Sequence, residues 1–186
     1  MNRFAVSDLP LEGLKLIERQ RIGDSRGFLS RLFCAEELAA AGWVKPIVQI
    51  NHTHTSLLGT VRGMHFQRPP HAEMKLVNCI RGEVWDVAVD LRTDSPTLLH
   101  WHAERLSADS GRALLIPEGF AHGFQALTDD VELLYCHSAA YNSSADAGLN
   151  PLDARLAITW PLAISELSAR DAAHPLIETG FEGVRL

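Results

Sequence analysis

The chain has 186 residues, of which 46% are hydrophobic, and its formal net charge is -6. This length and composition suffice to bury a core, and they favour one domain over residues 1–186 rather than two. The 17 lysines and arginines are scattered, so the sequence lacks the basic cluster that nucleic acids and anionic membranes select, and neither is expected as a partner.

The opening segment, MNRFAVSDLPLEGLKLIERQ, contains no apolar stretch of the kind found in secretory signals, and no run of about 18 apolar residues follows it. The three cysteines, Cys34, Cys79 and Cys136, are widely separated and form no CxxC pair. This usage is typical of free buried thiols in a reducing compartment rather than of disulfides or a zinc cluster. We therefore expect a soluble cytoplasmic protein.

Two short helices and a series of strands are predicted along the chain. The first helix is expected over 35–41, closed by Gly42. Between Val48 and Trp160, short β-type runs alternate with turn signals, among them KLVNCI, VWDVAVDL, LLHWHAERL, RALLI, FQAL and VELLYCHSAAY, with PEGFAHG read as a turn. Regular strand spacing of this kind predicts a sandwich or barrel. A second helix is expected around 165–173.

Strand alternation predicts which side chains face a cavity. In EVWDVAVDL, Asp86 and Asp90 lie on the same face as apolar residues, and such a mixed face is typical of a cavity wall. In RGMHFQ, Met64 and Phe66 lie on one face and His65 on the other. His65 can therefore point into a cavity while its neighbours pack in a core.

The segment GRALLIPEGFAH, which ends at His122, reads as a strand, a tight turn and an inward-pointing histidine. It resembles the second motif of the cupin superfamily, whose members are small jelly-roll barrels. In metal-binding cupins His122 would be one ligand, and an earlier H-x-H-x3-4-E motif would supply three more. Neither the H-T-H at 52–54 nor the set His65, His71 and Glu73 has that spacing, so no metal site is expected.

Proton-transfer chemistry needs a base, a partner that orients it, an acid on the opposite face and a cation for developing negative charge. The sequence offers His65 as the base, Tyr135 as the acid, Lys75 as the cation and an aspartate elsewhere as the partner. The same residues also fit a structural explanation, in which the histidine is hydrogen-bonded in a core and the tyrosine packs at a strand end. The residues alone leave both explanations open.

Several blocks of sequence together resemble dTDP-4-dehydrorhamnose 3,5-epimerases. They are RGMHFQ, MKLVNCIRGEVWDVAVDLRTDSPT, LSADSGRALLIPEGFAHGF, ELLY and LSARDA, and the resemblance extends from Arg26 to Asp171. It implies a mainly β, cupin-type jelly-roll barrel with short flanking helices and a C-terminal helical segment. It also implies an isomerase that inverts C3 and C5 of a nucleotide-linked 4-keto-6-deoxyhexose through an enolate, without a metal or organic cofactor. A homodimer with N-terminal strands crossing between subunits is implied too, as is a role in deoxysugar supply.

The resemblance also assigns roles to residues. His65 matches the family's base, Asp171 the aspartate paired with it, Tyr135 the acid and Lys75 the cation beside the C4 oxygen. The matched substrate-binding positions are Arg26, Arg31, Gln49, Asn51, Arg62, His122, Asp146 and Arg170.

The chain departs from the family pattern where the nucleotide is expected to bind. Arg31 stands where a glutamate is usual, and arginine can only donate hydrogen bonds. Ala140 stands where a tyrosine commonly stacks on the base, although Tyr141 follows it. These differences leave two hypotheses open: a dTDP-linked substrate inverted at both centres, and a different nucleotide sugar, such as a CDP-linked one, or inversion at one centre. A metal-dependent cupin enzyme and a non-catalytic sugar-nucleotide-binding barrel are further alternatives.

Overall fold

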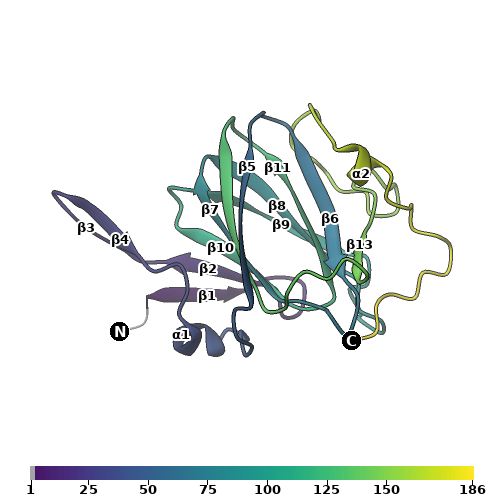
Figure 1. The fold of residues 1–186 in the computed structure, drawn as a ribbon, viewed down its shortest axis with the longest axis horizontal. Helices are drawn as coiled ribbons and strands as arrows, with labels where there is room; N and C mark the ends of the chain where they lie inside the picture. Colours follow the sequence, from purple (N-terminus) through teal and green to yellow (C-terminus); the bar gives the residue numbers. More distant parts are fainter. Residues whose placement is uncertain (1–2) are drawn as a thin grey trace.

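Two antiparallel β-sheets form the body of the molecule (Figure 1), in a computed structural model that describes residues 3–186. The larger sheet has six strands in the order β1-β2-β10-β7-β12-β5. Its members are β1 (Phe4–Asp8), β2 (Lys15–Arg19), β5 (Gln49–Thr55), β7 (Lys75–Arg81), β10 (Arg112–Ile116) and β12 (Val131–His137). The smaller sheet has five strands in the order β13-β6-β11-β8-β9. Its members are β6 (Val61–Gln67), β8 (Glu83–Asp90), β9 (Trp101–Ser107), β11 (Phe120–Ala126) and β13 (Asp146–Gly148).

The strand connections are those of a jelly roll. Every pairing within the two sheets is antiparallel, and most neighbours in space are distant in sequence. This is the arrangement in which two sheets pack around a shared interior. The predicted mainly β, cupin-type jelly roll is confirmed.

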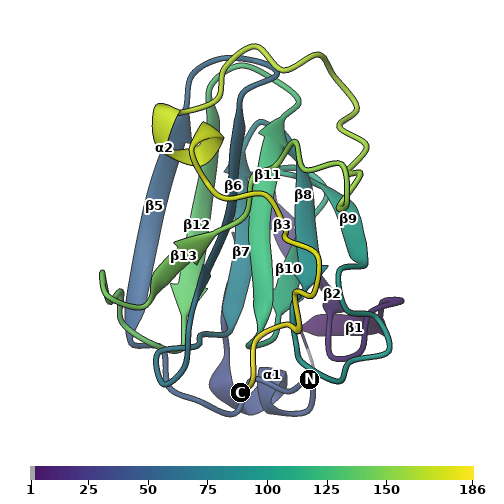
Figure 2. The same ribbon diagram turned by 90° about the vertical axis from the view of Figure 1, so that its right-hand side faces the viewer.

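The side chains alternate as the sequence predicts. One core lies between the sheets and includes Val84 and Ala88 of β8, both fully buried. A second core covers the outer face of the smaller sheet, where Met64 and Phe66 of β6 pack against the C-terminal segment that crosses this face in Figure 2. His65 lies between them in sequence and points to the opposite side, into the interior.

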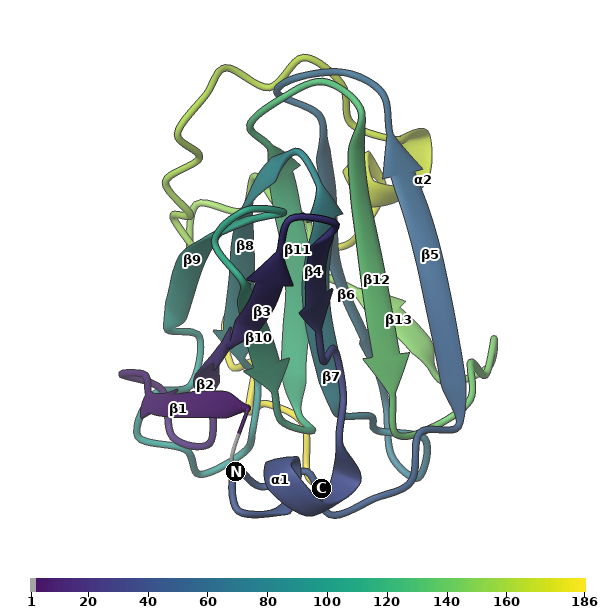
Figure 3. The same ribbon diagram turned by 90° about the vertical axis from the view of Figure 1, so that its left-hand side faces the viewer.

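The N-terminal hairpin β3 (Arg21–Asp24) and β4 (Gly27–Ser30) forms an arm that projects from the body (Figures 1 and 3). Its side chains gain little burial, and Phe28 and Leu29 are 61% and 71% exposed. The local sequence pattern did not predict β1 to β4. In β3 and β4 the apolar residues face solvent, so these strands lack the core-facing periodicity on which such prediction depends. This reason does not extend to β1 and β2, which bury Phe4, Leu16 and Ile17.

The first helix, α1 (Ala35–Ala39), ends two residues before the predicted boundary. Gly42 follows with a φ of 104°, a conformation that glycine adopts without strain and that turns the chain out of the helix. Leu38 is the buried residue of α1 and packs with Trp43 against the outer face of the larger sheet.

The second helix, α2 (Ala169–Ala172), is shorter than the predicted helix over 165–173. The residues before Ser168 are extended and pair with β6, where the N–H of Val61 donates to the carbonyl of Glu166. Tertiary pairing therefore overrides the local helical preference of this segment. The helix begins only where the Ser168 side chain caps it.

Two strand boundaries also differ from prediction. Strand β9 begins at Trp101 rather than at Leu98, the start of the predicted run, because the preceding residues form a turn in which Leu99 has a φ of 65°. The segment PEGFAHG, predicted as a turn, already contains the start of β11, since Phe120 pairs with Asp90 of β8.

The cysteines and the membrane expectation can be compared with the structure. Cys79 and Cys136 are buried and Cys34 is partly exposed, and all three are free thiols. The expectation of buried thiols is thus met by two of the three. Over residues 3–186, the structure contains no helix long and apolar enough to cross a membrane.

Candidate active site

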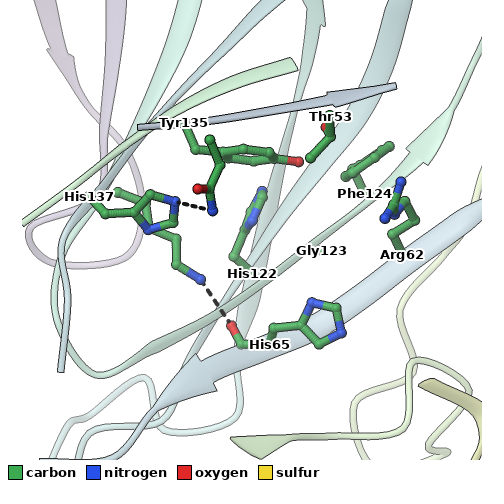
Figure 4. A pocket seen from close by; sticks show the side chains of 10 residues that line it. Thr53, Arg62, His65, His122, Gly123, Phe124, Tyr135 and His137 are labelled. Carbon is green, nitrogen blue, oxygen red and sulfur yellow. Dashed lines mark hydrogen bonds between the residues drawn. The ribbon is translucent and has the colours of Figure 1, made fainter. Parts of the chain in front are cut away.

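A cavity of about 180 Å³ opens between the two sheets (Figure 4). The larger sheet contributes Asn51, Thr53, Lys75, Tyr135 and His137, and the smaller sheet contributes Arg62, His65, His122, Gly123 and Phe124. A second cavity, of about 770 Å³, extends from it toward α2 and shares Arg62 and His65 with the first. The predicted base, acid and cation therefore line one cavity.

His65 forms a close pair with Asp171, which lies 106 residues further along the chain. The His65 Nε2 is 2.8 Å from the Asp171 Oδ1, and the carboxylate is 5% exposed. Its other oxygen accepts the backbone N–H of Gly63 at 3.2 Å. Burial pushes the pKa of Asp171 up, but the hydrogen bond and charge of His65, helped by the N–H of Gly63, outweigh burial and hold that pKa below its usual value. Asp171 is therefore an ionised acceptor.

The backbone around Gly63 makes this pairing possible. Gly63 has a φ of 128°, and a Cβ at this position would come within 2.5 Å of the Cα of Gly123 on β11. No other residue fits such a close approach of β6 and β11. The same position directs the N–H of Gly63 toward Asp171.

The tautomer of His65 follows from its partner. An ionised carboxylate can only accept hydrogen bonds, so the Nε2 of His65 carries the hydrogen that points to Asp171. The Nδ1 of the neutral ring is then the nitrogen that can accept a proton. This is the arrangement that a general base requires.

A second histidine stands beside this pair. The His174 ring lies 5.7 Å from that of His65, and its Nε2 is 3.8 Å from the Asp171 Oδ1. Burial, followed by the nearby charge of His65, lowers the pKa of His174. Ligand atoms of His65, Asp171 and His174 lie within 4.8 Å of one another, so these are the described residues that could approach a divalent cation together.

Tyr135 and Lys75 line the cavity from the larger sheet. Tyr135 is buried, and its ring packs 5.7 Å from His122 with its hydroxyl directed toward Thr53 (Figure 4). Burial and the negative charge of Asp86 raise the pKa of Tyr135, so the phenol stays protonated. The Lys75 Nζ lies 3.4 Å from the backbone oxygen of His65, which places its charge beside the predicted base.

Further predicted binding residues lie near the base, on the smaller sheet and on α2. His122 is buried and its Nε2 lies 2.8 Å from the Asp86 Oδ1. Arg62 lines both cavities, and its guanidinium donates to the carbonyl of His54 at 3.3 Å. Arg170 forms an ion pair with Asp146 and lines the larger cavity.

Gln49 and Asn51 lie on β5, at the edge of the larger sheet. The Gln49 Nε2 donates to the Asn51 Oδ1 at 3.0 Å, and Asn51 lines the smaller cavity. Asn51 therefore lines the site, whereas Gln49 lines neither cavity and reaches the site only through this hydrogen bond.

The structure does not bring Arg26 and Arg31 to either cavity. Arg26 lies in the turn of the projecting arm, where it donates to Asp24. Arg31 follows β4 and forms an ion pair with Glu37 of α1. Within one chain, neither arginine can contact a ligand bound beside His65.

Sequence reasoning overlooked four residues of the site: Glu73, Asp86, His137 and His174. His137 stands two residues from Tyr135 on β12, so the period of a strand could have identified it. Glu73 lies two residues before Lys75 but outside β7, where that period does not apply. Alternation placed Asp86 on a cavity wall but gave it no partner. No local signal pointed to His174, which lies outside regular structure.

The site occurs in a chain that is similar to known proteins along most of its length. A family model described as dTDP-4-dehydrorhamnose 3,5-epimerase matches residues 8–179. A curated relative of that name from Sinorhizobium fredii is 40% identical over 180 residues, which are 94% of this chain and 90% of the relative. A relative from Streptomyces niveus named dTDP-4-dehydrorhamnose 3-epimerase is 40% identical over 164 residues, with coverage of 88% and 79%.

Solved structures give the same result. The dTDP-4-dehydrorhamnose 3,5-epimerase of Bacillus anthracis, with TDP and PPi bound, has a TM-score of 0.90 at 38% identity and covers 94% of this chain and 99% of its own. The dTDP-6-deoxy-D-glucose-3,5-epimerase of Legionella pneumophila, in complex with dTDP-4-keto-L-rhamnose, has a TM-score of 0.88 at 37% identity, with coverage of 93% and 92%. The range matched in sequence and in fold therefore includes every residue of the site.

Proposed function

Because this chain belongs to the dTDP-4-dehydrorhamnose 3,5-epimerase family, we propose that it is the isomerase that converts dTDP-4-dehydro-6-deoxyglucose to dTDP-4-dehydrorhamnose by inverting C3 and C5. The observation that carries the proposal is the meeting, in one cavity, of the His65–Asp171 pair with Tyr135 and Lys75 on the facing sheet. We place the enzyme in the cytoplasm, in line with its three free thiols.

The proposed mechanism assigns one step to each residue. Both carbons lie next to the C4 ketone, so removal of either proton leaves an enolate. The Nδ1 of His65 takes the proton, and the C–H electron pair moves onto the C4 oxygen, where the Lys75 ammonium stabilises the negative charge. The Tyr135 hydroxyl then gives its proton to the opposite face of the same carbon. Proton exchange with solvent restores the neutral imidazole and the phenol.

Arg62 has two roles in this proposal. It lines both cavities, so it can hold the diphosphate while the sugar lies beside His65. Its positive charge also opposes the rise in the pKa of Tyr135 that burial and Asp86 cause, which makes proton donation less costly. His122 is fixed by Asp86 and contacts the sugar.

A homodimer completes the proposed site. The arm exposes Phe28 and Leu29, and β5 is an edge strand on which Ile50 is 57% exposed. Apolar side chains and an unpaired strand edge favour pairing with a second copy of the chain. An arm that crosses to the partner would bring its Arg26 and Arg31 to the partner's cavity, where one chain alone leaves them distant.

Arg31 bears on which nucleotide the substrate carries. Within one chain it forms an ion pair with Glu37, and it is membership of the family that supports a dTDP-linked substrate. A CDP-linked substrate stays as the alternative because arginine donates to the acceptor-rich edge of cytosine. The relative named as a 3-epimerase keeps single-centre inversion as a further alternative.

One experiment separates these possibilities. The protein is incubated in deuterated water with dTDP- and CDP-4-keto-6-deoxyglucose, and deuterium at C3 and C5 is followed by NMR. We expect exchange and inversion at both carbons of the dTDP sugar. Deuterium exchange at C3 alone supports inversion at a single centre. The absence of exchange with either nucleotide sugar refutes the proposal. The same assay after chelator treatment tests the metal-dependent alternative, and we expect unchanged activity.

A further inference from the structure

A chain of hydrogen bonds runs from the segment after β12 to Lys75, and each bond in it has a defined direction. It begins at the backbone of Tyr141, whose N–H donates to the Gln49 Oε1 at 2.9 Å. A backbone N–H can only donate, so this contact fixes the orientation of the Gln49 amide. The amide nitrogen of Gln49 must then face Asn51, and it donates to the Asn51 Oδ1 at 3.0 Å.

The fixed amide of Asn51 determines the tautomer of His137. With its oxygen engaged by Gln49, Asn51 presents its Nδ2 to the His137 Nε2 at 3.3 Å (Figure 4). The amide nitrogen donates, so the Nε2 of His137 must accept and carries no hydrogen. The direction of these bonds therefore assigns the ring hydrogen to Nδ1, which faces Glu73.

From His137 the chain continues to a buried carboxylate. The His137 Nδ1 lies 2.9 Å from the Glu73 Oε2, and the Glu73 Oε1 lies 3.3 Å from the Lys75 Nζ. Burial pushes the pKa of Glu73 up, but the hydrogen bond from His137 and the charge of Lys75 outweigh burial and lower it. Glu73 is thus ionised, and the side chains of Glu73 and Lys75 are only 10% and 9% exposed.

The Lys75 ammonium is held between two acceptors. One is the Glu73 carboxylate and the other is the backbone oxygen of His65, at 3.4 Å. If His137 were an imidazolium, a second cation would compete with Lys75 for the same carboxylate. The direction of the chain prevents this, because Asn51 already donates to the nitrogen that would need the extra proton.

We propose that Glu73 and His137 are positioning residues that hold the Lys75 ammonium toward the ketone oxygen, with His137 kept neutral by the chain through Asn51 and Gln49. The inference rests on the proposed function and adds two residues to it. A lysine placed by a buried, ionised carboxylate needs little reorganisation when charge develops on the substrate, which is the condition for strong electrostatic stabilisation.

The first test is a direct observation of the tautomer. Nitrogen-15 NMR of the folded enzyme at pH 7.5, with the His137 signals identified by their absence in His137→Asn, should show hydrogen on Nδ1 alone. Hydrogen on Nε2, or an imidazolium at pH 7.5, overturns the directed chain. This test does not depend on any substrate, so it separates failure of the chain from failure of the proposed function.

The second test is kinetic. Glu73→Gln keeps the shape of the side chain and removes its charge, so kcat should fall about 10- to 100-fold while KM changes less than about threefold, because Lys75 acts on the transition state. Glu104→Gln is the matched control, since Glu104 also pairs with a histidine, His102 at 2.9 Å, but lies on β9 at the far edge of the smaller sheet and lines neither cavity. It should leave kcat unchanged. The assignment is overturned if Glu73→Gln keeps kcat within twofold of the wild type, or if kcat/KM falls only through a rise in KM. If this variant does not fold, the NMR test decides.

Discussion

Replacing Asp171 by asparagine should disable the base without moving it. Asp171 accepts two hydrogen bonds, one from the His65 Nε2 and one from the backbone N–H of Gly63. The Gly63 N–H can only donate, so the oxygen of the asparagine amide must face Gly63. The amide NH₂ then faces His65, whose Nε2 has to accept. The ring hydrogen moves to Nδ1, the nitrogen that takes the substrate proton in the proposed mechanism.

The size of the effect follows from this change of tautomer. General base catalysis contributes about 10²- to 10⁴-fold, and the wrong tautomer removes most of it. The same substitution at the aspartate that orients the histidine of serine proteases costs about 10⁴-fold. We therefore expect kcat of Asp171→Asn to fall by about 10² to 10⁴, which corresponds to roughly 3 to 5 kcal/mol. KM should change little, because the buried carboxylate points at His65 rather than into the sugar's space.

The assay is deuterium incorporation at C3 and C5, measured by NMR at substrate saturation. Glu104→Gln is the matched control: Glu104 also pairs with a histidine, His102 at 2.9 Å, but the pair lies on β9 and lines neither cavity. The control should keep full activity. An Asp171→Asn enzyme that retains more than about a tenth of the wild-type kcat contradicts the tautomer argument.

Three further predictions follow from buried groups. Tyr135→Phe removes the proton donor, so inverted product should fall about 10²- to 10⁴-fold while slow deuterium exchange through His65 continues; loss of both in parallel contradicts the division of roles. Asp90 is fully buried, and although burial opposes it, hydrogen bonds from its turn hold its pKa at about 2. The ionised carboxylate therefore stabilises the fold above about pH 4, and this stabilisation is lost as the pH falls toward 2. Asp90→Asn should lower the free energy of unfolding in urea by about 2 to 4 kcal/mol at pH 7. A gap between the unfolding free energies of wild type and variant that does not narrow below pH 4 contradicts this. Burial raises the pKa of the Cys79 thiol from 9.0 to about 11, so its alkylation at pH 8 should be about 100-fold slower than that of an unperturbed thiol; equal rates in the folded and unfolded chain, by intact mass, refute it.

Alternation within a strand predicted the site where one face of that strand is buried. In β6, Met64 and Phe66 pack in the outer core, so His65 is forced to the cavity side. The same rule applied to β12 leads from Tyr135 to His137, whereas Glu73 lies before the start of β7 and outside its reach. A period of two residues is enough when each face of a strand has a different environment.

Contacts between distant segments were not accessible to this rule. The partner of His65 was assigned by resemblance to a family, since nothing in the LSARDA segment itself indicates that Asp171 returns to β6. The segment before α2 was predicted as helix from its local pattern. Its actual pairing with β6 forms only in the folded sheet, so no local signal could indicate it. The arm was missed for the opposite reason: its apolar residues face solvent in one chain, so they show no periodicity toward a core.

The division of the site between two sheets accounts for inversion in the proposed mechanism. The base and its partner belong to the side of the smaller sheet, and the acid and the cation belong to the larger sheet. A sugar ring between the sheets therefore presents one face to His65 and the other to Tyr135. A base and an acid on one strand face would return the proton to the side from which it came, and the configuration would be retained. Because the sheets are held apart by the core between them, the acid and the base remain on opposite sides of the ring, and the two carbons next to the ketone can use the same pair.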